Sequence, residues 1–276
     1  MDVKPALVKE LRERTGAGMM DCKNALVDAN GDLDAAGELL RKQGQAKADK
    51  KASRVAAEGR VVLKSDQGTG RYALVEVNSE TDFVAKDDNF RGFAERVAGV
   101  VLDKRPASLE ALMGLAADGR TLEESRRDLV TKVGENINVR RFELVESKGN
   151  VGAYVHGARI GVLVELEGGS EELARQLAMH ISFAAPEWTT RDDVPADVLA
   201  AERSIFENTD EVQSKPEAAR EKIVDGMLNK RFFAATPGGA LVEQAWIHEP
   251  SKTVGQALSE AGAAVSRFVR ISVTGS

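Results

Sequence analysis

The residue types that could carry catalytic chemistry are present in this sequence, but their spacing does not match a catalytic motif. The single cysteine, Cys22, has no histidine close in sequence that could activate its thiol. The acidic pairs Asp87-Asp88 and Asp192-Asp193 stand in polar turns, where capping of the following helix accounts for them. The histidines lie far apart, and each lacks a second ligand at the spacing of a metal site; they are His156, His180 and His248. We therefore expect no catalytic residue, no metal site and no cofactor.

Nucleotide-binding and hydrolase motifs are also missing from the sequence. There is no G-x-x-x-x-G-K-[ST] loop, and Gly68-Thr69-Gly70 lacks the third glycine of a dinucleotide-binding turn. There is no H-E-x-x-H motif and no G-x-S-x-G elbow. The sequence therefore favours a protein that acts by binding rather than by covalent catalysis.

One turn carries an unusual pair of side chains. In the stretch NSETDFVAKDDNF (Asn78–Phe90), Phe83 stands beside Asp82 in a polar turn that follows the apolar segment Tyr72–Val77. A large apolar side chain that stays in water loses the stabilisation of about 1.5–3 kcal/mol that its burial would provide. The ring either folds back onto its own helix or fills a pocket of a partner, as aromatic residues do at binding hot spots.

Composition limits the classes of partner. The 276 residues are enough for two or three modest domains, and the net charge of −6 provides no overall basic field for nucleic acid. The basic stretch Gln45–Arg60 contains no aromatic residue of the kind that RNA-binding surfaces use. One cysteine indicates a reducing compartment. Because no apolar run approaches a signal peptide or a membrane span of about 20 residues, we expect a cytoplasmic protein without membrane contact.

The N-terminal part predicts three short helices over residues 1–45, followed by a basic helical linker over residues 46–60. The third helix is expected from Leu33 to about Gln43. The boundaries are the break Gly16-Ala17-Gly18, the start at Met19, the turn Asn30-Gly31, the cap Asp32 and the stop Gly44.

The remaining chain repeats one pattern of hairpin, helix and strand, over residues 61–147 and again over residues 148–276. ALVEV (Ala73–Val77) resembles VLVEL (Val162–Leu166), and NVRRFELV (Asn138–Val145) resembles VSRFVRIS (Val265–Ser272). The pattern predicts an α+β fold with two related halves, each an antiparallel sheet covered by helices. Chance similarity of apolar strands is the alternative. The expected strands are Val61–Leu63, Tyr72–Val77, Ile137–Val145, Val151–His156, Ile160–Leu166 and Val265–Val273.

The second half contains a long, charged and helical segment at about 191–235. Lys215-Pro216 interrupts it near the middle. Two helical arms joined by a turn predict an antiparallel hairpin that projects from the domain.

Several collinear stretches resemble the bacterial elongation factor Ts family, whose members are guanine-nucleotide exchange factors for elongation factor Tu. They extend from near the first residue to near the last, and the first two are highly specific. These stretches are Leu7–Leu26, Thr81–Phe90, Val133–Phe142, His156–Leu166 and Glu249–Leu258.

The resemblance implies a three-helix module like a ubiquitin-associated (UBA) domain, two α+β subdomains and a coiled-coil hairpin inserted in the second. It implies that Arg12, Met19 and Met20 dock on the nucleotide domain of elongation factor Tu, although packing inside the bundle core is an alternative for the two methionines. It further implies that Thr81, Asp82, Phe83 and Val84 disturb the partner's Mg²⁺ site, and that His156 lies where the second subdomain holds the partner's other domains.

Two further expectations follow from the resemblance. Some relatives continue into an additional C-terminal helix that touches the partner, whereas this sequence ends at Ser276. That contact is therefore not expected here, although the Phe83 contact would be unaffected. The competing hypothesis is a non-enzymatic adaptor that uses the UBA-like module and the helical hairpin to bind another protein.

Overall fold

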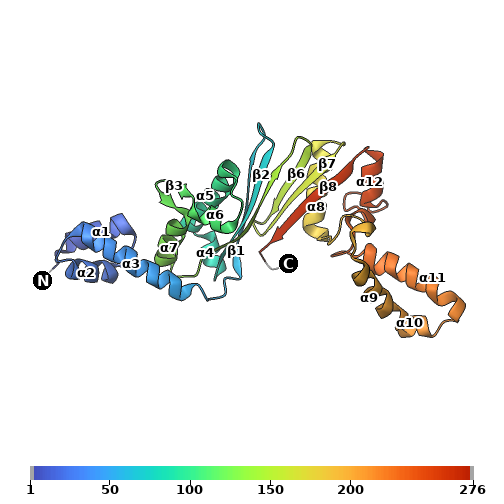
Figure 1. Ribbon diagram of the computed structural model, residues 1–276, viewed down its shortest axis with the longest axis horizontal. Coiled ribbons are helices and arrows are strands. Elements are labelled where there is room, and N and C mark those ends of the chain that lie inside the picture. Colours follow the sequence, from blue (N-terminus) through green and yellow to red (C-terminus); the bar gives the residue numbers. More distant parts are fainter. Residues whose placement is uncertain (1–2, 274–276) are drawn as a thin grey trace. The chain divides into compact units, whose positions relative to one another are not determined.

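A computed structural model describes residues 3–273 of the chain (Figure 1). The fold is α+β, with helices packed on small antiparallel sheets. The chain divides into two compact units. Of the described residues, the first unit contains 3–66, 71–144 and 272–273, and the second contains 67–70 and 145–271.

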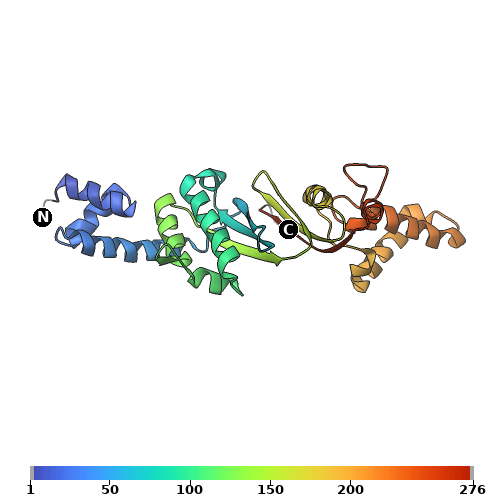
Figure 2. The same ribbon diagram turned by 90° about the horizontal axis from the view of Figure 1, so that it is seen from above.

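The first unit begins with three helices that pack against one another (Figure 2). Helix α1 spans Pro5–Thr15, α2 spans Met19–Asp28 and α3 spans Leu33–Lys51. Gly16 ends α1 with a φ of 69°, and the Asp32 side chain accepts hydrogen bonds from the first turn of α3. The core of this cluster consists of Val8, Leu11, Ala17, Cys22, Ala25, Leu26, Ala36 and Leu40.

The predicted stop at Gly44 is wrong, because α3 continues through it to Lys51. Gly44 lies against Thr131 of helix α7 (Leu122–Val133), and a Cβ at position 44 would sit 2.8 Å from the Thr131 Oγ1. The glycine therefore permits close approach of two helices rather than ending one of them. The stretch predicted as a helical linker is helical only to residue 51, and strand β1 begins at Glu58, three residues before the predicted start.

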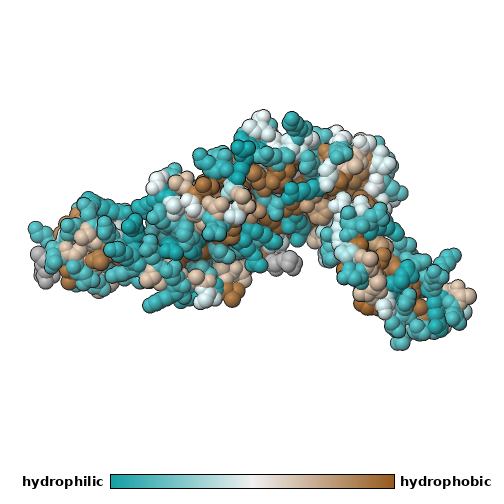
Figure 3. Space-filling view, in the orientation of Figure 1, coloured by the Kyte–Doolittle hydropathy of each residue, from teal (hydrophilic) through white to brown (hydrophobic). Residues whose placement is uncertain are grey.

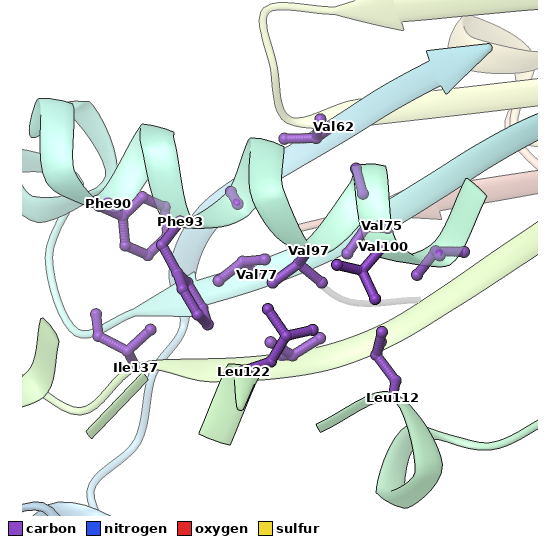
Figure 4. Packing of buried hydrophobic residues seen from close by; sticks show 14 of the residues in the cluster. Val62, Val75, Val77, Phe90, Phe93, Val97, Val100, Leu112, Leu122 and Ile137 are labelled. Atoms are coloured by element: carbon purple, nitrogen blue, oxygen red, sulfur yellow. The ribbon is translucent and has the colours of Figure 1, made fainter. Parts of the chain in front are cut away.

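A three-stranded sheet forms the centre of the first unit. Its strands are β1 (Glu58–Asp66), β2 (Arg71–Ser79) and β5 (Asn138–Glu146), in the order β1-β2-β5, and β1 and β2 are antiparallel. Helix α5 (Asp88–Lys104) packs on this sheet. Figure 4 shows Phe90, Phe93, Val97 and Val100 facing the strand residues Val62, Val75 and Val77, with Leu112, Leu122 and Ile137 closing the core.

Three small elements of the first unit were not predicted. They are helix α6 (Leu109–Gly114) and the two-residue strands β3 (Ala116–Ala117) and β4 (Arg120–Thr121). Helix α7 begins with a capping box, in which Thr121 and Glu124 satisfy each other's backbone N–H groups.

The second unit repeats the topology of the first. Its sheet has the order β6-β7-β8, with β6 at Asn150–His156, β7 at Ile160–Glu167 and β8 at Ala264–Ser272. Helix α8 (Glu171–Ala184) packs on β6 and β7, and the Ser170 side chain caps its start. The two similar sequence pairs occupy equivalent strands, since ALVEV and VLVEL lie in the central strands β2 and β7. Helix α12 (Val254–Glu260) was not predicted.

A helical segment is inserted between α8 and the end of the second unit. It contains α9 (Ala196–Glu207), α10 (Asp210–Gln213), α11 (Glu217–Met227) and the π-helical turn η2 (Leu228–Phe233), and short 3-10 turns lie at Arg191–Asp193 and Leu241–Glu243. Helices α9 and α11 are linked by an Arg203–Asp225 ion pair of 2.6 Å. The space-filling view shows apolar surface over α9 (Figure 3), where Val198 and Ile205 are exposed. The segment has its own small core, which consists of Val194, Phe206, Val212, Val224, Met227, Leu228 and Phe233.

Candidate functional site

The turn that carries Phe83 forms a very short helix, α4 (Asp82–Lys86). Thr81 caps it, because the Thr81 Oγ1 accepts a hydrogen bond from the Val84 N–H at 3.4 Å. The Phe83 side chain is 81% exposed, whereas Val84 packs against the core of the first unit and Ala85 is buried. The interpretation in which the ring folds back onto its own helix is therefore wrong.

The turn is fixed to the segment that connects α7 with β5. Thr81 donates its backbone N–H to Glu135 Oε2 at 3.0 Å and its hydroxyl to Glu135 Oε1 at 2.6 Å. In the opposite direction, Glu80 Oε1 accepts the backbone N–H of Asn136 at 2.7 Å. Ser79 adds a hydrogen bond from its hydroxyl to the Thr81 carbonyl at 2.8 Å. These bonds hold the short helix in place although it lacks the length to be stable alone.

Asp82 stands next to the exposed ring and is ionised at neutral pH. Lys86, one turn further on, donates to Asp82 Oδ2 at 2.7 Å. This hydrogen bond lowers the pKa of Asp82 below its ordinary value. Asp82 and Phe83 therefore present a negative charge and a large apolar ring side by side.

The residues predicted in the N-terminal helices lie on the surface. Met19 is 49% exposed and Met20 is 63% exposed at the start of α2, and Arg12 is exposed on α1. Packing of the two methionines in the bundle core is therefore wrong. Val27 is also exposed and follows Met20 by seven residues, which places both on one face of α2. Val27 was not predicted as part of this surface, although its helical spacing from Met20 could have identified it.

His156 belongs to the second unit, whereas the other predicted site residues belong to the first. It is exposed at the end of β6. Its Nδ1 lies 3.0 Å from the Tyr154 hydroxyl, so the neighbouring tyrosine orients the imidazole.

The candidates for catalytic chemistry have structural roles. Among residues 3–273, no group of histidine, cysteine and carboxylate side chains could hold a metal ion. The Asp87 side chain caps α5, and Asp193 accepts from the N–H and hydroxyl of Thr190. Cys22 is fully buried in the three-helix core. Within the same described range, none of the helices combines the length and the apolar character that crossing a membrane requires.

Comparison with known proteins gives a consistent result over the whole chain. The family model described as Elongation factor TS matches residues 80–275. Proteins named Elongation factor Ts from Alkalilimnicola ehrlichii and Thioalkalivibrio sulfidiphilus are 51% and 52% identical to this chain over 274 and 275 residues, which is 99% of this chain and 92% of each relative. The protein of the same name from Halorhodospira halophila is 50% identical over 273 residues, with the same coverage.

Proposed function

Because the chain belongs to the elongation factor Ts family, we propose that it binds elongation factor Tu carrying GDP and promotes release of the GDP, so that GTP can load. The activity needs no covalent step and no cofactor. The observation that carries the proposal is the exposed Phe83 ring on a turn that is otherwise firmly held.

Phe83 is proposed to enter an apolar pocket of the partner's nucleotide-binding domain. The ring makes few contacts with its own chain, so its burial in a partner would contribute about 1.5–3 kcal/mol. Because the backbone of the turn is already ordered, little further conformational entropy is lost on binding. Asp82 would enter the same junction with its negative charge and act on the elements that hold Mg²⁺.

Disturbing the Mg²⁺ site is an effective way to release a tightly bound nucleotide. A nucleotide with a nanomolar Kd has about 12 kcal/mol of binding free energy, and its unaided release is slow. Much of that energy comes from backbone N–H groups and Mg²⁺ around the phosphates. A displacement of these groups weakens the nucleotide, and the coupling is reciprocal, so GDP must weaken binding of the exchange factor to the same extent.

The other predicted contacts complete the proposed interface. Helices α1–α3 are proposed to form the UBA-like module, which docks through Arg12, Met19 and Met20 on the nucleotide domain. Two exposed methionines suit this role, because their flexible side chains adapt to an apolar partner surface. His156 is proposed to contact the partner's other domains.

The domain boundaries are also proposed by correspondence with the elongation factor Ts family. The module, linker and two subdomains correspond to residues 1–45, 46–60, 61–147 and 148–276, and the helical insertion near 191–235 corresponds to the coiled-coil hairpin. No nucleic acid or membrane takes part, and the protein acts in the cytoplasm.

The test is release of fluorescent GDP from elongation factor Tu, with and without catalytic amounts of this chain. The wild-type chain should accelerate release, and Phe83→Ala should reduce the acceleration about 10- to 100-fold, which corresponds to the burial energy of the ring. Phe183→Ala is the matched control, because Phe183 is also exposed, at 71%, but lies on α8 of the second unit.

Two results would contradict the proposal. A wild-type chain that leaves GDP release unchanged would exclude the exchange activity. Equal losses for Phe83→Ala and Phe183→Ala would exclude a specific role for the Phe83 turn.

A further inference from the structure

The Phe83 turn depends on one carboxylate from a distant part of the chain. Thr81 has two donors, its backbone N–H and its hydroxyl, and each reaches a different oxygen of Glu135. Glu135 is 54 residues away in sequence and is only partly exposed. Because both oxygens are used, an amide in place of the carboxylate would offer one acceptor and direct an NH₂ group at the other donor.

The same hydroxyl transmits this constraint to the helix that carries Phe83. Since the Thr81 hydroxyl proton points to Glu135, an oxygen lone pair remains for the Val84 N–H, which it accepts at 3.4 Å. Helix α4 has five residues, too few to be stable through its own hydrogen bonds. The direction of its first turn, and thus of Phe83, is therefore set by the bond from Thr81 to Glu135 and by the buried Ala85.

The residues on both sides of Glu135 are themselves fixed. Asn136 donates its backbone N–H to Glu80, and its side-chain amide donates to the Arg54 carbonyl at 2.8 Å. Lys51, the last residue of α3, donates to the Gly134 carbonyl. Glu135 is thus presented from a rigid segment rather than from a free loop.

From this geometry we propose that Glu135 is a positioning residue for nucleotide exchange, which holds the Thr81–Val84 turn so that Phe83 is presented in the productive direction. The inference rests on the proposed exchange activity. Glu135 acts through Thr81 and has no need to touch the partner. It is expected to affect the maximal exchange rate more than the affinity for elongation factor Tu, because the exposed surface of Arg12, Met19 and Met20 is untouched.

The test substitution is Glu135→Gln, which keeps the size and shape of the side chain. Glu124→Gln is the matched control, because Glu124 also accepts a threonine backbone N–H, that of Thr121 at 3.0 Å, but at the start of α7. We expect Glu135→Gln to lower the maximal rate of GDP release about tenfold and to change the half-saturating concentration less than about twofold. Glu124→Gln should leave both unchanged.

A double-mutant cycle separates positioning from a general structural effect. In a Phe83→Ala background, Glu135→Gln should reduce the rate no further, since the ring it positions is gone. Amide hydrogen exchange gives a second readout, because the Val84 N–H should lose about tenfold protection in Glu135→Gln while the amides of the α5 interior keep theirs.

The outcomes distinguish the two levels of the inference. A wild-type chain that does not release GDP would overturn the proposed function before any variant is compared. If the wild-type chain is active, an unchanged rate in Glu135→Gln, or equal losses with and without Phe83, would overturn the positioning role alone. A loss that requires Phe83 and accompanies faster exchange of the Val84 amide would support it.

Discussion

Replacing Gln244 with methionine should strongly destabilise the second unit. Gln244 is fully buried, and its Oε1 lies 3.0 Å from His180 Nε2. Its amide nitrogen donates to the carbonyls of Ala184, Ala235 and Gly238. Ala184 is the last residue of α8 before the helical insertion, and the other two carbonyls follow the insertion. One side chain thus joins both ends of the inserted segment.

The expected loss in the free energy of unfolding follows from the polar groups that Gln244→Met leaves without a hydrogen-bond partner. The Ile247 N–H donates to His180 Nδ1, so the imidazole proton is on Nε2 and needs the Gln244 oxygen. The Ala184 carbonyl keeps a hydrogen bond from the Gly238 N–H. The buried His180 N–H loses its partner at a cost of about 1–3 kcal/mol, and the carbonyls of the half-buried Ala235 and Gly238 each lose a hydrogen bond with a net value of about 1 kcal/mol. The expected loss of stability is therefore about 3–5 kcal/mol.

The assay is urea unfolding followed by tryptophan fluorescence. The sequence contains two tryptophans, Trp188 and Trp246, and both lie in the second unit. Gln256→Met is the control, because Gln256 is exposed and accepts only the Thr253 N–H at the start of α12. Loss of that cap should cost about 0.5–1 kcal/mol. A Gln244→Met variant as stable as Gln256→Met, with an unchanged dependence on urea, would refute the reasoning.

Two further predictions concern stability. Burial lowers the pKa of His180 below its ordinary value of 6.5, so the unfolded chain binds the proton more readily than the folded chain. The free energy of unfolding should therefore fall as the pH is lowered from about 7.5 to about 5.5. In urea titrations, the His180→Gln variant should lose part of this pH dependence. Gly44→Val should lower stability by about 1–3 kcal/mol more than Gly37→Val, because a Cβ at position 44 meets Thr131 whereas one at position 37 meets nothing within 4 Å. Equal thermal unfolding of the two valine variants, measured by circular dichroism, would contradict this prediction.

Features that depend on neighbouring residues could be predicted from the sequence. The caps at Asp32, Thr121 and Ser170 each use a side chain and a backbone N–H within three residues. The hairpin around residues 67–70 and the alternation of the strands are similarly local. For this reason the main strands, and the repetition of the sheet topology, followed from the sequence pattern, whereas the short elements α6, β3, β4 and α12 did not.

Features that depend on residues distant in sequence could not be predicted. Gly44 is of the residue type that often ends a helix. Only its contact with Thr131, 87 residues later, shows why a glycine stands inside the helix. Glu135 has the appearance of a surface residue after a helix, yet it holds Thr81. His180 and Gln244 are 64 residues apart, and neither position indicates the pair. Tertiary hydrogen bonds of this kind leave no periodic signal in the chain.

In the Phe83 turn, the residue proposed to bind a partner and the residues that stabilise the turn stand next to one another. Val84 and Ala85 provide the burial that attaches the turn to the first unit, and Thr81 provides the hydrogen bonds. Phe83 contributes little to either, because most of its surface is in water. A ring that carried part of the core could not enter another protein without loss of stability in its own chain. The division of roles therefore leaves the whole burial energy of the Phe83 side chain available for a partner, and it means that a loss of exchange on truncation of the ring cannot be attributed to unfolding.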